Sequence, residues 1–289
     1  MSQEGVQKLA LDARTVKAPR ITQGGLLLGI GLAMLATMLI VTIFAPFLVP
    51  FDPSATSPDS LAGASARHWL GTDSIGRDVL SRLIVGGRTT LLITITAVLI
   101  ALLGGLVLGL LSGYLGGVID DAIMRILDVV FAFPVLLLAI AVVAALGPTI
   151  PNLILTIAIV YTPAMARVVR APVLSVKQWD HVEAARSIGM SEFRLVLRHI
   201  LPLVVSPILV ATSLTLSQTI FTVTALSFLG LGPPPPDPNW GGMLSEARQF
   251  MELAPLTVIG PAAAIVFATL TFIVLANGLR DVLDVGSVR

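Results

Sequence analysis

Long uncharged apolar runs alternate with short polar segments along this chain. The uncharged runs cover 21–51, 89–119, 129–166, 203–230 and 253–279. A helix needs about 20 residues to cross the hydrocarbon core of a bilayer, so each run is long enough to span it. The third run contains Pro148 and Pro151, which stop a helix, so it predicts two spans joined by a tight turn. The pattern therefore predicts an all-α integral membrane protein with a six-helix transmembrane bundle, at about 24–49, 88–113, 121–146, 152–170, 203–229 and 256–278.

Composition agrees with a lipid environment. Apolar residues make up 55% of the chain and charged residues 12%, with a mean hydropathy of +0.94. A soluble domain carries about 25% charged residues. The net charge of +1 argues against a nucleic-acid partner. The chain has no cysteine, which excludes disulfides and zinc–thiolate sites.

The basic residues predict the orientation in the membrane. The segment 1–23 is basic and could introduce a signal peptide, but the uncharged run behind it exceeds the roughly 7–15 residues of a signal-peptide core. We therefore expect a cytoplasmic tail and a retained first span. Of the 18 Lys and Arg residues, 13 share a side with the N-terminus. The remaining 5 (18 − 13) are Arg67, Arg77, Arg82, Arg88 and Arg248. This bias predicts that both termini are cytoplasmic.

The same topology divides the chain into segments. The extracytoplasmic segments are expected at 50–87 and 230–255, and a cytoplasmic loop at 171–202. The core of the transmembrane domain covers 88–278, and 279–289 forms a second cytoplasmic tail. The second extracytoplasmic segment holds four consecutive prolines, 233–236, which favour a stiff extended strut.

Two spans carry polar or small-residue patterns. Glycine recurs at every fourth position from Gly105 to Gly117, which predicts a bare helix face for close packing against this chain or another. The fifth span carries Thr212, Thr215, Thr219 and Thr222 on one face, with Gln218 beside them. These residues favour the wall of a wet translocation path, because a lipid-facing amide would be costly. Hydroxyls that bond their own helix carbonyls are the alternative.

The loop before the fifth span has the form of helix, glycine, helix. Asp180 and Glu183 have the spacing of a capping box, so the first helix is expected to begin there and to stop at Gly189. Ser191 can cap the second helix. On it Phe193, Leu197 and Ile200 are expected on one face, with Arg194 and Arg198 on another. The exposed small residues of the first helix favour contact with a protein partner. The alternative is an amphipathic helix resting on lipid headgroups.

Several blocks resemble one known family. Glu183-Ala184-Ala185, followed by Gly189 and by Leu201-Pro202, resembles the cytoplasmic loop of ABC importer permeases, although His199 stands where that pattern usually has isoleucine. The segments 68–83, 228–236 and 240–244 resemble the second, C-type permease subunit of dipeptide, oligopeptide and nickel importers. The similarity extends over roughly residues 20 to 285.

The resemblance implies a type I importer fold and a set of partners. These would be a homologous sister permease, two ATP-binding subunits and an extracytoplasmic substrate-binding protein. No cofactor is expected in this chain, with ATP and Mg bound by the ATPase subunits. The ATPase-coupling residues would be Glu183, Ala184, Ala185, Arg186, Gly189, Leu201 and Pro202. The residues facing the binding protein would be Trp69, Asp73, Arg77, Asp78, Trp240 and Met243, although interfacial anchoring is an alternative for the tryptophans.

We find no catalytic constellation and no phosphate-binding loop in the sequence, so we expect a non-catalytic membrane subunit. The function that fits best is a permease half of an ATP-driven importer in the prokaryotic plasma membrane, with peptides favoured over nickel or glutathione. Two alternatives remain open. An ion-coupled secondary transporter needs ionisable residues within the cores of its spans, and these cores have none. Asp120, Asp121, Arg125 and Asp128 cluster at the inner end of the third span, where we interpret them as an interfacial ion-pair group and not as a relay. A non-pore assembly subunit is the other.

Overall fold

A computed structural model describes residues 20–286, and the parts of the expected tails at 1–19 and 287–289 lie outside it. Within the described residues the protein is helical, with one isolated bridge between Thr72 and Asp78 in place of a sheet. The helices are α2 (Arg20–Ile43), α3 (Ala45–Leu48), α4 (Val79–Leu115), α5 (Gly117–Phe131), α6 (Val135–Leu146), α7 (Ile150–Val176), α8 (Asp180–Ser187), α9 (Glu192–Leu195), the π-helix η2 (Val196–Ile200), α10 (Leu201–Phe228), α11 (Trp240–Ala247), the 3-10 helix η3 (Arg248–Phe250) and α12 (Leu256–Gly286).

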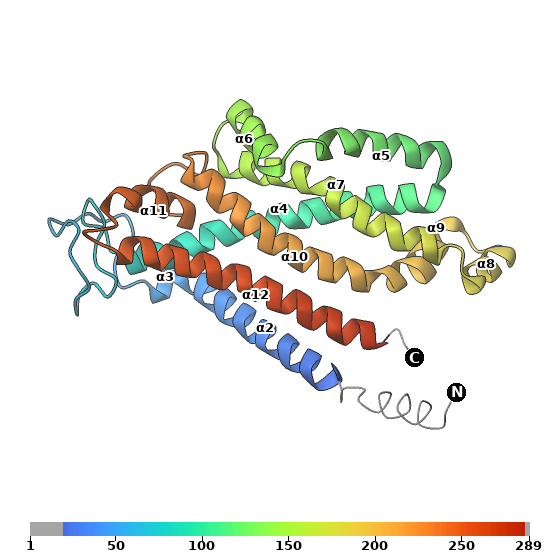
Figure 1. Ribbon diagram of the computed structural model, residues 1–289, viewed down its shortest axis with the longest axis horizontal. Helices are drawn as coiled ribbons and strands as arrows, with labels where there is room; N and C mark the ends of the chain where they lie inside the picture. Colours follow the sequence, from blue (N-terminus) through green and yellow to red (C-terminus); the bar gives the residue numbers. More distant parts are fainter. Residues whose placement is uncertain (1–19, 287–289) are drawn as a thin grey trace, which may run out of the picture.

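The long helices run side by side along the long axis of the molecule (Figure 1). One end carries α8 and α9, and the other carries α11 with the loop 49–78; we call these the α8 end and the α11 end. Five helices are individually long and apolar enough to cross a membrane. The pair α5 and α6 supplies a sixth crossing if the two are counted as one span. The expected all-α membrane architecture is therefore confirmed, with five spans, or six when the bent pair is counted as one.

The third span is not the single helix expected at 121–146. It is broken into α5 and α6, which meet at an angle of 85°. Pro134 precedes α6 as its N-cap residue, and α5 ends at Phe131. A proline lacks the N–H for the helix and disfavours helical geometry in the residue before it, so Pro134 favours a break at this point.

The first two spans also differ from their expected bounds. The helix expected at 24–49 ends at Ile43, and the short helix α3 follows with Pro46 in its first turn. The helix α4 begins at Val79, nine residues before the expected start at 88. It begins there because the carboxylate of Asp78 accepts a hydrogen bond from the Ser81 amide at 2.8 Å and so caps the helix. Arg82 and Arg88 therefore lie on the helix and not in the outer loop.

The glycine face of α4 packs against α7 of the same chain. A Cβ on Gly105 would lie 2.4 Å from Cβ of Met165, and one on Gly109 would lie 2.5 Å from the carbonyl oxygen of Ala166. Gly113 meets α7 in the same way, whereas Gly117 lies beyond the end of α4 and has no neighbour within 4 Å. Three glycines therefore make the close approach, and the expected fourth does not.

A second close pair joins the two ends of the chain. α2 packs along α12 at the edge of the molecule (Figure 1), where a Cβ on Gly278 would lie 2.4 Å from the backbone nitrogen of Leu28. A Cβ on Gly31 would meet the backbone of Leu275 at 2.9 Å. Glycine thus sets the backbone separation in this pair as it does between α4 and α7.

Candidate functional site

The loop at the α8 end is a compact helix–turn–helix. α8 ends in a Schellman motif, in which the Gly189 amide donates to Arg186 at 3.0 Å and the Met190 amide donates to Ala185 at 3.3 Å. Gly189 has a φ of +83°, the left-handed conformation that glycine adopts without strain. The expected stop at Gly189 is thus what the structure shows, and the turn fixes the angle between α8 and α9.

α8 has one face buried and one face open. Val182 and Ala185 pack into an apolar cluster with Leu195 and Ile200. Glu183, Ala184 and Arg186 lie on the exposed side, and Gly189 is exposed at the tip. Of the expected coupling residues, Ala185 therefore holds the helix to the protein, while Glu183, Ala184, Arg186 and Gly189 form an accessible surface. Leu201 and Pro202 lie at the start of α10, where Pro202 occupies the first turn.

The expected caps of this loop are not formed. The N-cap residue of α8 is Trp179, so Asp180 already belongs to the first turn. Ser191 does occupy the N-cap position of α9, but its side chain makes no cap hydrogen bond. Asp180 and Glu183 still favour the helix, because carboxylates in the first turn interact well with the helix dipole.

The apolar face expected for the second helix is wrong. Phe193 is 76% exposed and Leu197 45% exposed, whereas Leu195 and Ile200 are fully buried. The cause is η2, because a π-helix takes more residues per turn and brings positions five apart onto one face. Pro202 lies two residues after η2. Its ring has no N–H to donate and would clash with the carbonyl group four residues before it in a regular α-helix, and a wider turn relieves that clash.

Two contacts fasten α8 and the end of α7 to the end of α4. The Lys177 ammonium donates to the carbonyl oxygens of Gly113 at 2.7 Å and Tyr114 at 3.3 Å. These are terminal carbonyls of α4, where a cation is favoured by the helix dipole. Arg186 donates to the hydroxyl of Tyr114 at 3.2 Å. Sequence reasoning missed Tyr114 and Lys177, since nothing in their local pattern shows that they meet.

Ion pairs join α5 to α7 near the same end. Arg170 donates from Nε to Asp120 at 2.6 Å and makes a second bond from its Nη2, while Arg167 pairs with Asp128. The guanidinium of Arg167 also lies 3.9 Å from the ring centroid of Phe131. Two acids of the expected ion-pair group therefore pair with two arginines of α7, and Arg125, the cation expected in that group, takes part in neither pair.

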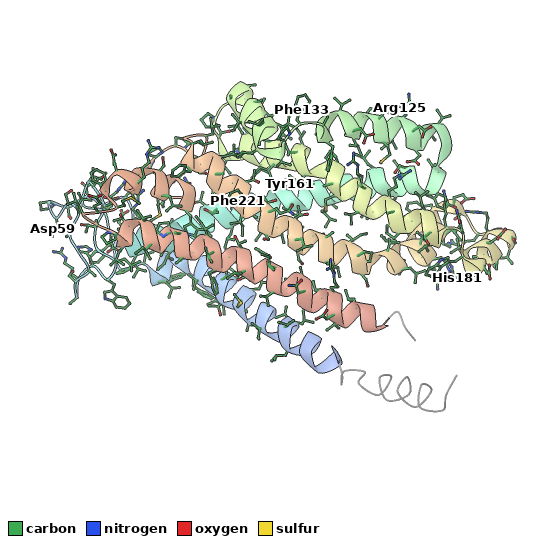
Figure 2. The ribbon with its side chains drawn as sticks, viewed as in Figure 1. Asp59, Arg125, Phe133, Tyr161, His181 and Phe221 are labelled. Atoms are coloured by element: carbon green, nitrogen blue, oxygen red, sulfur yellow. The ribbon has the colours of Figure 1, made fainter. Side chains whose placement is uncertain are left out.

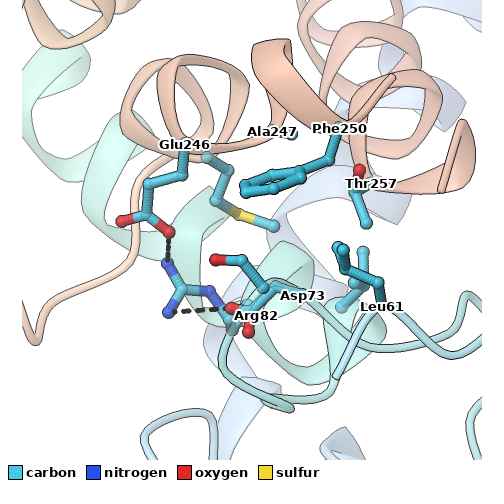
Figure 3. A pocket seen from close by; sticks show the side chains of 10 residues that line it. Leu61, Asp73, Arg82, Glu246, Ala247, Phe250 and Thr257 are labelled. Carbon is cyan, nitrogen blue, oxygen red and sulfur yellow. Dashed lines mark hydrogen bonds and ion pairs between the residues drawn. The ribbon is translucent and has the colours of Figure 1, made fainter. Parts of the chain in front are cut away.

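The α11 end holds a second charged network. Figure 3 shows the guanidinium of Arg82 between the carboxylates of Glu246 and Asp73. Arg77 also bonds both acids, with Nε 2.6 Å from Asp73 and Nη2 2.7 Å from Glu246. Two arginines and two acids thus tie the start of α4 and the preceding loop to α11.

The residues expected to face a binding protein differ in how exposed their side chains are. Trp69 is 70% exposed. Asp78 is buried and bonds His68 at 2.8 Å, and Arg77 is buried in the ion-pair network. Trp240 and Met243 are buried too, and the Trp240 indole donates to the carbonyl oxygen of Leu83 at 3.0 Å. Asp73 is mostly covered by its arginine partners. In this chain Trp69 is the member of the set with a broadly accessible side chain.

The polar face of α10 points largely inward. Thr215, Thr219 and Thr222 are buried, and the Thr222 hydroxyl lies 2.9 Å from that of Tyr161 on α7. Thr212 bonds the carbonyl of its own helix at Ile208, as the alternative interpretation expected. Gln218 is exposed.

A cavity opens beside α10. It has a volume of about 510 Å³ and is lined by both polar and aromatic side chains, among them Gln218, Phe221 and Tyr161. Figure 2 shows Tyr161 and Phe221 at mid-length, between the labelled Asp59 and His181 at the two ends. Tyr161 and Phe221 were not singled out from the sequence, because a lone aromatic in a span carries no signal. Among the side chains that the structure describes, residues 24–283, no group of His, Asp or Glu could hold a metal ion.

Comparison with known proteins agrees with this architecture. The family described as binding-protein-dependent transport system inner membrane component matches residues 105–286. A glutathione transport system permease protein of Shigella flexneri is 50% identical over 249 residues, covering 86% of this chain and 82% of that one. A dipeptide transport system permease protein of Alkalihalophilus pseudofirmus is 43% identical over 256 residues, covering 88% and 84%.

Solved structures show the same fold. The chain superposes on an inward-facing MetNI methionine ABC transporter with a TM-score of 0.57 at 18% identity, covering 71% of this chain and 96% of that chain. An amino acid ABC transporter gives a TM-score of 0.52 at 23% identity, covering 68% and 92%. By its family match, its relatives and its fold, this chain belongs to the binding-protein-dependent transport system inner membrane components, as a permease subunit of the peptide branch of ABC importers.

Proposed function

We propose that this chain forms half of the translocation path of an ATP-driven importer for small peptides. Its partners would be a homologous sister permease, two ATP-binding subunits and an extracytoplasmic binding protein. The names of the glutathione and dipeptide permeases that it resembles support a peptide cargo, glutathione being itself a tripeptide. One observation carries the mechanism: α8 presents an exposed surface and is bonded to the end of α4 behind it.

The exposed side of α8 supports docking to an ATPase subunit. Glu183 and Arg186 can make charge-assisted bonds across the contact, and Ala184 lets a partner approach closely. Ile188 is 82% exposed, which suits burial against a partner protein. The alternative, an amphipathic helix on lipid, places an apolar face outward, whereas the apolar residues Val182 and Ala185 of α8 are turned inward.

Coupling requires that α8 move as one body with the membrane helices. Switching a two-state transporter from 1:99 to 99:1 takes about 5.5 kcal/mol of differential binding. A freely hinged loop would dissipate that free energy in its own motion. Here the buried cluster around Leu195 and the bonds from Lys177 and Arg186 connect α8 to α4 and α7. α4 has 37 residues and so extends about 55 Å at 1.5 Å per residue, far enough to reach the α11 end.

This assignment orients the protein with the α8 end in the cytoplasm. The α11 end would then face the binding protein, with Trp69 as an accessible contact. The cavity beside Gln218 and Phe221 lies between the two ends and would face the path shared with the sister permease. Thr215, Thr219 and Thr222 would support that wall from behind, through contacts such as Thr222 with Tyr161.

The test measures peptide uptake by the complete importer reconstituted in lipid vesicles. ATP is supplied on the side of the membrane to which the α8 end faces. We expect ATP-dependent uptake of dialanine or glutathione that an ionophore does not abolish. Glu183→Arg should assemble but lose most of the uptake per ATP hydrolysed. Glu252→Arg, a matched change at the exposed α11 end, should keep that ratio. Uptake that needs an ion gradient and no ATP would overturn the proposal.

A further inference from the structure

Three ionisable side chains lie along one flank of α5, beside the face that packs on α7. Asp121, Arg125 and Asp128 are four and three residues apart, so they lie above one another along the helix. Arg167 of α7 joins them through its ion pair with Asp128. We call these residues the charged flank, and its two acids and two arginines balance in charge. Among the side chains that the structure describes, neither Asp121 nor Arg125 has an ion-pair partner.

The deeper end of the charged flank lies within the hydrocarbon. Arg167 lies 17 residues (167 − 150) after Ile150, the first residue of α7, and so about 25 Å along that helix. The hydrocarbon core is about 30 Å thick, so Arg167 does not reach its inner boundary. On α5, Val118 lies nearer the α8 end and is 84% exposed, whereas Phe133 lies beyond the flank and is 55% exposed. Figure 2 shows Arg125 at the edge of the molecule, between Phe133 and the α8 end, so exposed apolar side chains lie on both sides of the flank.

The charged flank is accessible at this depth. The side chain of Asp128 is 58% exposed and that of Arg167 is 37% exposed. An arginine can extend its guanidinium toward the headgroups, but an aspartate is too short to do so. Ionisable groups within spans almost always face the protein interior or a water-filled cavity, because lipid does not solvate them. The charged flank therefore needs water, whereas the neighbouring face of α5, with Ile126 69% and Val129 65% exposed, suits lipid or an apolar protein surface.

The position of α5 connects this water to the transport path. α5 leads directly into α6, whose Val135 and Leu136 line the cavity beside Gln218. Water along the charged flank would continue that cavity toward the α8 end. We propose that the charged flank lines the cytoplasmic half of the translocation path and contacts the charged termini of the peptide as it leaves. The inference rests on the proposed function and adds cargo-contacting residues to it.

The charges of the flank match a zwitterionic cargo. Arg125 presents a guanidinium to the peptide carboxylate, and Asp121 presents a carboxylate to the peptide ammonium. Residues four apart on a helix have Cβ atoms about 5–6 Å apart, and the ends of an extended dipeptide are about 7 Å apart. Because the flank has no net charge, it attracts neither sign strongly. A path must bind its cargo weakly enough to release it, so this balance favours passage over capture.

The absence of cysteine from this chain allows a direct test of the water contact. Arg125→Cys and Ile126→Cys place single thiols at neighbouring positions, one on the charged flank and one on the apolar face. Each variant is assembled into the complete importer in lipid nanodiscs and labelled with a charged maleimide that does not enter lipid. We expect Arg125→Cys to react at least tenfold faster. Exposure in the isolated chain predicts the reverse order, because Ile126 is the more exposed of the two side chains.

A second probe guards against a local folding defect. Asp121→Cys lies on the same flank and should also react at least tenfold faster than Ile126→Cys. Neither flank substitution removes an ion pair among the described residues. Copurification of the partner subunits checks assembly of all three variants.

Cargoes of opposite charge test the contact with the peptide. Alanyl-aspartate carries an additional negative charge and alanyl-lysine an additional positive charge. Arg125→Glu should lower the ratio of alanyl-aspartate uptake to alanyl-lysine uptake at least threefold relative to wild type, with binding protein at saturation. Arg194→Glu makes the same charge change on the exposed surface of α9 and should leave this ratio unchanged, even where total uptake falls.

The outcomes separate this inference from the proposed function. Labelling of Ile126→Cys as fast as that of both flank variants, or no labelling of the flank variants, overturns the water-filled path along α5. An unchanged uptake ratio in Arg125→Glu overturns the contact with the cargo. If wild-type importer takes up dialanine on ATP in either case, the importer function stands. If the flank variants react rapidly but uptake never requires ATP, the proposed function fails and the water-facing flank stands.

Discussion

Arg186 donates a hydrogen bond of 3.2 Å to the hydroxyl of Tyr114, 72 residues earlier in the chain. The bond joins the exposed side of α8 to the last turn of α4. The guanidinium carbon also lies 5.8 Å from the Tyr114 ring centroid, within cation–π range. This pair connects the proposed ATPase-binding surface with the helix that reaches the α11 end.

Tyr114→Phe should lower the amount of peptide transported per ATP hydrolysed. The variant keeps the ring and removes the hydroxyl, and a net hydrogen bond of about 0.5–1.5 kcal/mol corresponds to a two- to tenfold change in an equilibrium. The measurement is paired uptake and ATPase activity in vesicles, with binding protein at saturation.

A double-mutant cycle is the control for that pair. Arg186→Gln alone should reduce the peptide transported per ATP hydrolysed at least as much, because Arg186 also lies on the proposed ATPase-binding surface. Adding Tyr114→Phe to Arg186→Gln should then cost little more than Arg186→Gln alone. Additive losses would show that the two residues act separately and would contradict the connection.

Gly189→Val should uncouple transport without removing the protein from the membrane. A side chain at this φ costs about 1–2 kcal/mol, and nothing lies within 4 Å of the added Cβ, so the effect is one of backbone geometry alone. Gly189→Asn is the matched control, because asparagine tolerates the left-handed conformation. The measurement is the amount of peptide transported per ATP hydrolysed. Equal values for the two variants would show that coupling does not need this turn geometry.

Gly109→Val should loosen the α4–α7 pair. Its Cβ would overlap the backbone oxygen of Ala166 and the side chain of Val169, and such overpacking costs about 1–3 kcal/mol. The apparent Tm of the purified complex should fall by several degrees. Gly104→Ala, on the same helix, meets only the Thr162 side chain at 3.3 Å and should shift the Tm much less.

Asp120→Arg should weaken the contact between α5 and α7, because it leaves Arg170 facing a like charge while the Arg167–Asp128 pair remains. The reversed pair, Asp120→Arg with Arg170→Asp, should recover at least part of the lost stability. The measurement is the Tm of the complex, together with the reactivity of a single cysteine introduced at Ala122 on α5. No recovery in the reversed pair would mean that the ion pair contributes through local geometry and not through charge.

The number and positions of the spans were predictable because hydrophobic length is a strong signal. The break within the third span could not be predicted, although the sequence contains Pro134 at that point. A proline within an apolar run can either kink a helix or end it, and Pro163 and Pro207 lie inside intact helices. Which outcome occurs depends on packing that the local sequence does not specify.

The candidate site was also predictable only in part. The stop at Gly189 follows from one residue with an unusual backbone requirement. The buried face of the second helix was wrong because a 3.6-residue period was applied across a π-turn. Tyr114, Lys177 and Glu246 were missed because their partners lie far away in the sequence, and residue type alone does not reveal such pairs.

The break between α5 and α6 has a consequence for biogenesis. α5 has 15 residues and α6 has 12, so they extend about 22 Å and 18 Å, and neither reaches across a hydrocarbon core of about 30 Å. Non-helical backbone at that depth is tolerated only when protein or water covers it. If the proposed sister permease covers this break, a newly inserted copy without it would expose the peptide groups of the break to lipid. We expect such orphan copies to be short-lived substrates of membrane proteolysis, so that synthesis of the two permeases must be balanced.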